Sequence, residues 1–322
     1  MSFKNHCGPR ARRTKRPSGP IDLTCLIKKA EEYDDHYLEV MTHSVELYSD
    51  RSDEIIEEFL SKKNRAAFHL TNPHSKRIWL VELLNEFLAD HRQRAGSKWR
   101  EAECDDVAFA LVTLTHKGWV CSEKNIQFDL VRAKQKVRNA LAGTNFIGNF
   151  DVALYTNEDW TTEGIKGKLV SFHCHAVVWG RNRTQLDRLR KYIRPRFEPI
   201  LGNDNGAHFA ALETVGDAAA ALAYMPKLPF LGYRTEVNES GKKTQKNTPK
   251  VTFQSRWHLL NELMKHSLFD FSLSGGAGTH ILRAARNRCK KKHKPREVHS
   301  RGILNLRRPI TTARRHGQAA TL

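Results

Sequence analysis

Two histidines separated by one residue, His173 and His175, are the first side chains whose type and spacing could do chemistry. The surrounding segment Lys168–Gly180 is rich in β-branched and apolar residues, and we expect it to form a strand. Side chains at positions i and i+2 of a strand share a face, so the imidazoles converge and Cys174 faces the other side. Paired neutral imidazoles are good ligands for a divalent cation. The competing interpretation is two half-exposed strand histidines.

Tyr224 and Lys227, three positions apart, form a second candidate group. We expect residues 217–227 to be helical, and residues three apart on a helix share a face. A neighbouring cation lowers the pKa of a phenol and stabilises charge that develops on a phosphate. Pro226 strains or ends a helix beside the pair, so a core tyrosine near a helix end is the competing interpretation.

These residues must be positioned by the strands and helices of the middle of the chain. The apolar stretch 106–115 is expected to be a buried strand that ends near Thr113, Thr115 and His116. Further strands are expected at 146–156, 168–180 and 206–215, with helices at 126–141, 183–197 and 217–227. The order β-α-β-β-α-β-α predicts an α+β fold, with a mostly antiparallel sheet and helices on one face. The polar stretch 231–251 is expected to be a flexible excursion.

Composition divides the chain into four parts. Residues 1–20 are expected to be a basic disordered arm, and residues 21–100 a helical region in which 78–91 has apolar residues at three- and four-residue spacing. Residues 101–274 would form the sheet-containing domain. Residues 275–322 would form a basic C-terminal tail.

The net charge of +19 lies almost entirely at the two ends of the chain. The first twenty residues carry +6 and the last forty-eight carry +12, while the middle is nearly neutral. Basic arms on a neutral body indicate a polyanionic partner. The candidate phosphate contacts are Arg283, Arg286, Arg288, Lys290, Lys291, Lys292, Lys294 and Arg296. The alternative is a basic tail that only aids solubility.

Several protein classes are excluded or disfavoured by composition. No apolar run is long enough to span a membrane, and the basic first residues are not followed by the apolar stretch of a secretory signal. The six cysteines are scattered without a CxxC pair, which argues against a disulfide framework or zinc ribbon and favours a reducing compartment. No GxxxxGK[ST] phosphate loop is present, so the sequence shows no helicase module.

The order of three motifs resembles the HUH-type endonuclease superfamily, in particular the rolling-circle replication initiators called Rep proteins. An apolar strand ending in LT comes first, the strand with His173 and His175 follows, and the helical Tyr224 and Lys227 come last. The resemblance covers residues 106–230. Cys174 replaces the usual bulky aliphatic residue, and Pro226 is a second departure from the family pattern.

The resemblance implies a site and an activity. His173 and His175 would bind Mn²⁺ or Mg²⁺ with Asp151 as third ligand, for which Glu158 is the second candidate. Tyr224 would attack a phosphate of single-stranded DNA at a replication origin and form a 5′-phosphotyrosine, with Lys227 stabilising charge. The partners would be a helicase and a polymerase of the host, since the chain itself shows no helicase module. The protein would be located in the cytoplasm of a prokaryotic host, near the nucleoid.

Two other functions and one rival nucleophile stay open. A single-tyrosine transposase of the same superfamily would use the same site on single-stranded DNA. A non-catalytic nucleic-acid-binding protein would keep the two histidines for structure only. Tyr233, in a glycine-flanked stretch, is the rival to Tyr224 as nucleophile. Trp119 and Trp179 could offer stacking faces to bases, although core packing is the expected role for both.

Overall fold

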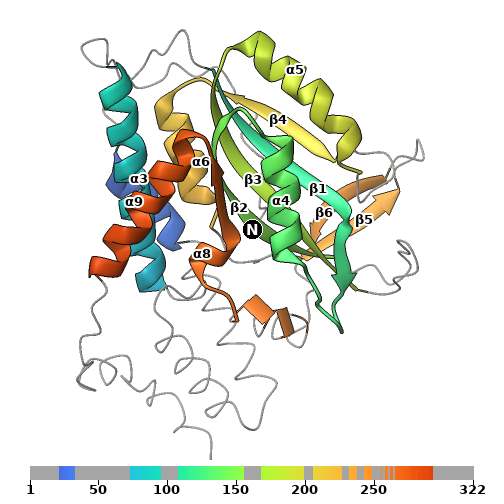
Figure 1. Cartoon of the computed structure of the whole chain (residues 1–322). Helices are drawn as coiled ribbons and strands as arrows, with labels where there is room; N and C mark the ends of the chain where they lie inside the picture. Colours follow the sequence, from blue (N-terminus) through green and yellow to red (C-terminus); the bar gives the residue numbers. More distant parts are fainter. Residues whose placement is uncertain are drawn as a thin grey trace, which may run out of the picture.

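The computed structural model describes residues 22–32, 73–95, 108–155, 168–198, 206–226, 232–237, 243–248, 255, 258–259, 262–263 and 265–292. Strands in this part of the chain form one seven-stranded sheet with helices packed around it (Figure 1). The fold is therefore α+β. The elements are α3 (Pro73–Ala95), β1 (Ala108–Ser122), α4 (Leu130–Ala140), β2 (Asn145–Tyr155), β3 (Leu169–Arg181), α5 (Arg183–Ile193), η2 (Arg194–Arg196), β4 (Ala207–Leu212), α6 (Val215–Tyr224), β5 (Gly232–Val237), β6 (Lys243–Thr248), α8 (Leu268–Phe271), β7 (Ser272–Gly275) and α9 (Ala277–Lys292).

The sheet is mixed rather than antiparallel throughout. Its strand order is β4-β1-β3-β2-β5-β6, and β7 also pairs with β2. β1, β2, β3 and β4 pair antiparallel, but β2 and β5 run parallel through Leu154↔Gly232 and Tyr155↔Tyr233. The expectation of an antiparallel sheet is wrong at this pair, because the long connection between the two strands allows β5 to return in the same direction.

The polar stretch expected to be a flexible excursion contains two strands. β5 and β6 pair antiparallel from Gly232↔Thr248 to Val237↔Lys243. Such a pair lies at the end of the sheet, where backbone hydrogen bonds hold the strands and the side chains can remain polar. Because these strands lack alternating apolar residues, hydrophobic periodicity in the sequence did not predict them.

Helices cover both faces of the sheet, which corrects the expectation of helices on one face. Alternation along β3 puts His173, His175 and Trp179 on one face, the histidine face, and Cys174 on the other, the cysteine face. On the histidine face, Phe87 of α3 packs edge-on against Trp179 at 5.6 Å between ring centroids. On the cysteine face lie α4 and α5, and Figure 1 shows them apart from the group formed by α3, α6 and α9. The sheet is therefore the middle of three layers.

The segment that enters α4 fixes this helix on the cysteine face. The ring of Phe128 stacks on Phe172 of β3, with 3.9 Å between centroids and 6° between planes. Asp129 then caps the helix by accepting a hydrogen bond from the backbone N–H of Arg132, at 2.9 Å. Ala133 and Val137, one turn apart, are buried beneath it.

Helix α3 contains the 78–91 pattern that predicted it. Its buried side chains include Trp79, Leu83, Leu84 and Phe87, which belong to the same core cluster as the central strands. The helical region and the sheet thus share one core in the described residues. Within these residues, no helix is both long and apolar enough to cross a membrane.

Helix α9 occupies the first part of the segment expected to be a basic tail. Ile281, Ala285 and Cys289 recur every four residues and are buried, so the helix packs with one face inward. Its charged side pairs with α3: the Arg288 guanidinium lies 2.5 Å from a Glu86 carboxylate oxygen. Residues 1–20 and 293–322, the rest of the expected arm and tail, lie outside the described residues.

We predict that Gly278→Ala destabilises the fold. A Cβ at Gly278 would lie 2.0 Å from the carbonyl oxygen of Phe146, so α9 would have to move off β2. Glycine to alanine inside a helix is usually stabilising by up to about 1 kcal/mol, whereas here we expect a loss of about 2 kcal/mol or more. Urea unfolding followed by circular dichroism measures it. Asn287→Ala, at an exposed position of the same helix, is the control and should change stability by less than about 0.5 kcal/mol.

Candidate active site

The pairing of β2 with β3 brings one carboxylate and two imidazoles together. Asp151 lies directly opposite His173 in the antiparallel register, and His175 follows two residues further along the same face. The Asp151 Oδ2 atom lies 3.5 Å from His173 Nε2 and 3.8 Å from His175 Nε2. One candidate ligand atom from each of the three residues lies within 4.8 Å of the others. The expected convergence of both histidines beside Asp151 is present.

This group could hold a metal ion. Two atoms bound to one cation at 2.0–2.3 Å are about 3–4 Å apart, which matches the two carboxylate–imidazole distances. Two imidazole nitrogens and one carboxylate oxygen suit divalent cations of intermediate softness. The chemistry of the donors and their spacing therefore fit a metal, and small side-chain rotations would complete the approach.

Burial differs between the carboxylate and the imidazoles. The Asp151 side chain is 1% exposed, while those of His173 and His175 are each 14% exposed. The Asp151 Oδ1 atom accepts a hydrogen bond from the backbone N–H of Val152 at 2.7 Å, which orients Oδ2 toward the histidines. The group is thus anchored in the sheet at the carboxylate and reachable from solvent at the imidazoles.

Cys174, between the two histidines, belongs to the opposite layer. Its side chain is fully buried on the cysteine face, and this burial raises the pKa of its thiol. The thiol is therefore neutral and packed rather than a metal ligand. A small side chain at this position fits the packed core beneath β3.

Thr113 of β1 orients one of the two histidines. It lies opposite His175 in the β1–β3 register, and its Oγ1 atom is 2.9 Å from His175 Nδ1. When Nδ1–H donates to Thr113, Nε2 keeps the lone pair that faces Asp151, which is the tautomer that metal binding requires. The apolar strand ending in Thr113 thus supplies a residue that positions the site, a role that spacing in the sequence did not assign.

Thr113 is part of a polar row that crosses the histidine face. The row runs over five strands in the paired positions His208, Thr113, His175, Asn149 and Ser272. Ser272 Oγ lies 3.3 Å from Asn149 Oδ1 and donates to it. The row joins residues as far apart in the sequence as Thr113 and Ser272, so only the strand register reveals it.

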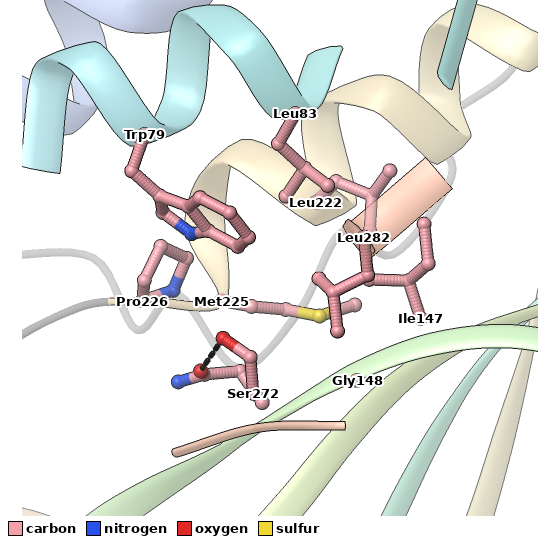
Figure 2. Close-up of a pocket in the computed structure, with 10 residues that line it drawn as sticks. Trp79, Leu83, Ile147, Gly148, Leu222, Met225, Pro226, Ser272 and Leu282 are labelled. Atoms are coloured by element: carbon pink, nitrogen blue, oxygen red, sulfur yellow. Dashed lines mark hydrogen bonds between the residues drawn. The ribbon is translucent and has the colours of Figure 1, made fainter. Parts of the chain in front are cut away.

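Helix α6 ends next to this row. Figure 2 shows a small, mainly apolar cavity where α3, α6 and α9 meet β2, with Met225 and Pro226 beside the hydrogen-bonded Ser272. Asn149, the partner of Ser272, also lines it and lies opposite His175 in the sheet. The C-terminal end of α6 therefore lies over the histidine face, close to the Asp151–His173–His175 group.

Tyr224 is the last residue of α6 and is not a core tyrosine. Its side chain is 49% exposed, which excludes the buried interpretation. A capping box of Thr214 and Asp217 fixes the start of the helix. The helix ends at Tyr224, two residues before Pro226, whereas the sequence predicted a helix as far as residue 227. Lys227 itself lies outside the described residues.

The rival Tyr233 lies in β5 rather than in a turn. It pairs with Tyr155 of β2, and their rings are 5.7 Å apart between centroids. It packs against a small apolar cluster with Ala153 and Leu169. Glu158, the second candidate for the third ligand, lies outside the described residues.

The candidate DNA contacts of the C-terminal segment are only partly available for binding. Arg288 and Lys292 form ion pairs with Glu86 and Glu82 of α3. The Arg286 guanidinium lies over the ring of Phe269, 4.7 Å from its centroid. Arg283, Lys290 and Lys291 are exposed on α9, while Lys294 and Arg296 lie outside the described residues.

Trp119 and Trp179 are core residues, as expected. They are 6% and 2% exposed, and Trp119 packs edge-on against Phe150 and Phe197. Neither indole presents a free face to a base.

No protein-family model, curated protein or solved structure matches this chain. The resemblance to HUH-type endonucleases therefore rests on its three motifs. What the structure adds is the Asp151–His173–His175 group and its place beside the end of α6.

We predict that Mn²⁺ binding needs both histidines. His173→Ala and His175→Ala should each weaken Mn²⁺ binding by at least about 10-fold, because each removes one of three ligands. Isothermal titration calorimetry and electron paramagnetic resonance of Mn²⁺ measure the affinity. His208→Ala, an exposed histidine on the same face of β4, is the control and should bind Mn²⁺ normally. Equal affinities for all variants would exclude this metal site.

We also predict that Thr113→Val weakens Mn²⁺ binding without removing a ligand. Valine keeps the shape of the side chain but cannot hydrogen-bond to Nδ1 of His175, so the ring loses its preferred orientation. Loss of such a supporting bond typically costs about 10-fold or more in metal affinity. Thr113→Ser, which keeps the hydroxyl beside Nδ1 of His175, is the matched control and should bind Mn²⁺ nearly as tightly as the wild type. An equal loss for Thr113→Ser and Thr113→Val would show that Thr113 acts through general packing.

Proposed function

We propose that this protein is a metal-dependent endonuclease and strand transferase that cuts single-stranded DNA with Tyr224 as nucleophile. The observation that carries the proposal is the convergence of Asp151, His173 and His175 on the sheet face over which α6 ends. A half-exposed tyrosine at that helix end supports it. Three motifs in the Rep order support it from the sequence.

The three residues of the sheet would hold Mn²⁺ or Mg²⁺. Such an ion supplies Lewis-acid polarisation of a non-bridging phosphate oxygen. A set of two imidazoles and one carboxylate favours Mn²⁺ over Mg²⁺, which prefers oxygen ligands. Thr113 would keep His175 in the binding tautomer throughout.

Tyr224 would perform the covalent step. Its phenolic oxygen would attack the scissile phosphorus, forming a Tyr–O–P bond and breaking the P–O3′ bond. The 5′-phosphate of the strand downstream of the cut would remain on the tyrosine, the released 3′-oxygen of the upstream strand would take up a proton, and the tyrosine proton would pass to solvent. Lys227 would stabilise the charge that develops.

The phosphotyrosine link conserves the energy of the broken phosphodiester bond. A later 3′-OH could therefore attack the link and rejoin the strand without another energy source. A nick that leaves a free 3′ end for a polymerase and can be closed again suits initiation and termination of rolling-circle replication. A separate helicase and a polymerase would then be the partners.

We predict a covalent protein–DNA adduct that depends on Tyr224. The full-length protein is mixed with Mn²⁺ and a single-stranded DNA library that carries a randomised stretch, then denatured. DNA that stays attached to protein is sequenced, which also reports the cleavage site. Tyr224→Phe should abolish the adduct, because the ring keeps its packing but loses the attacking oxygen. His173→Ala should greatly reduce it.

The control for this experiment is Tyr233→Phe, which should form the adduct normally because Tyr233 packs in β5. Mass spectrometry of the adduct peptide identifies the modified residue. A nucleotide on any tyrosine other than Tyr224 would falsify the assignment. If the folded, metal-loaded wild-type protein forms no adduct, the result would favour the non-catalytic binding function.

A further inference from the structure

A second polar surface lies on the cysteine face, in a groove between α4 and α5. Asn139, Arg181, Gln185, Arg188 and Tyr192 contribute to its lining. The three α5 residues in this set follow three- and four-residue spacing, so they form one stripe of the helix that faces α4. The groove is remote from the Asp151–His173–His175 group, because the sheet lies between them.

The helices that border this groove are strongly basic. α4 carries four basic residues and no acidic one. α5 carries four basic residues and one acidic residue, Asp187, which pairs with Arg190 at 3.1 Å. η2 adds Arg194 and Arg196. Together α4, α5 and η2 carry ten basic residues and one acidic residue, although the middle of the chain is nearly neutral as a whole.

The two arginines that line the groove are placed to meet an anion. The Arg181 guanidinium donates to the Gly143 carbonyl at 3.0 Å, which holds the side chain at the groove. Arg188 is exposed, and among the described residues no acidic side chain forms a salt bridge with it. The planar guanidinium group of arginine matches the geometry of phosphate oxygens.

Tyr192 gives the groove an aromatic surface. Half of this side chain is exposed, and only two other large hydrophobic residues of the described chain are exposed to a comparable degree, Val131 and Tyr224. The Arg196 guanidinium lies 3.6 Å from the centre of the Tyr192 ring. The guanidinium covers one face of the ring, so an unpaired base would stack on the opposite face or on the plane of the guanidinium.

We propose that the groove between α4 and α5 binds single-stranded nucleic acid, with phosphates against Arg181 and Arg188 and a base stacked on Tyr192. Cations beside an exposed aromatic ring can bind the phosphates and a base of a single strand together. This surface would be a binding site separate from the proposed cleavage site, and it is built from residues outside the C-terminal basic segment.

Fluorescence anisotropy with labelled oligo(dT) tests the proposal on the full-length protein, in the presence of EDTA so that no cleavage occurs. Tyr192→Ala should weaken binding by about 10-fold, while Tyr192→Phe should bind as wild type because stacking needs the ring and not the hydroxyl. Arg188→Ala should weaken binding and make the dependence of log K on log salt shallower by about 0.7, the change for one lost phosphate contact.

Arg183→Ala is the matched control for charge. It removes the same charge from an exposed position on α5 that does not line the groove, and it should leave affinity and salt dependence nearly unchanged. Thermal unfolding by circular dichroism confirms that each variant is folded. Equal losses for Arg183→Ala and Arg188→Ala would show a diffuse charge effect and overturn the proposal.

Photo-crosslinking gives a direct readout that is independent of the C-terminal segment. An oligonucleotide with 5-iododeoxyuridine should crosslink to the peptide that contains Tyr192, as identified by mass spectrometry. Crosslinks confined to residues 275–322 would overturn the proposal. The crosslinking assay needs neither a metal nor Tyr224. Failure of the cleavage assay would therefore not affect the crosslinking result, and failure of crosslinking would not affect the cleavage result.

Duplex DNA and anionic vesicles serve as competitors for the same labelled oligo(dT). Single-stranded DNA or RNA should compete best, since stacking on Tyr192 needs an unpaired base. The contrary result is that anionic vesicles compete as well as unlabelled oligo(dT) with the wild-type protein and fail to compete with Arg188→Ala. That result would identify a lipid surface as the partner and overturn the proposal.

Discussion

The antiparallel pairing of β2 with β3 is the constraint on which the candidate site depends. Asp151 meets His173 only because this register puts them opposite each other. Because side chains alternate along a strand, a slip by one residue would send the carboxylate into the packed cysteine face and leave the imidazoles without it. The buried aromatic layer around Phe172 and Phe128 resists such a slip, since it would have to expose apolar surface.

The same sheet separates two surfaces with different chemistry. Its histidine face carries a carboxylate and two imidazoles, and α6 ends over this face with the half-exposed Tyr224. Its cysteine face is covered by α4 and α5, whose outer surface is basic. The two proposed sites therefore lie on opposite faces of the sheet, and variants of each can be tested separately.

Charge is used for two purposes in this fold. Arg288 and Lys292 of α9 pair with Glu86 and Glu82 of α3, and these contacts join the last described helix to the first long one. The carboxylates are nearly buried, at 15% and 3% exposed, so the partner cations compensate charge that would otherwise be costly. Other cations, such as Arg188, face solvent at a groove instead.

Local periodicity in the sequence was enough to determine the shared face of His173 and His175, the helix around Trp79 and the element order from β1 to α6. These features depend on residues that are close together in the chain. The role of Asp151 as third ligand could be predicted only from the family resemblance. The sequence does not show which residue of β2 lies opposite His173, because contacts across the whole core set the β2–β3 register. The role of Thr113, the polar strands β5 and β6 and the packing of α9 were decided by tertiary structure. Their partners are far away in the sequence. Neither charge nor polarity shows which distant backbone or side chain will form a hydrogen bond or pack with each of these residues.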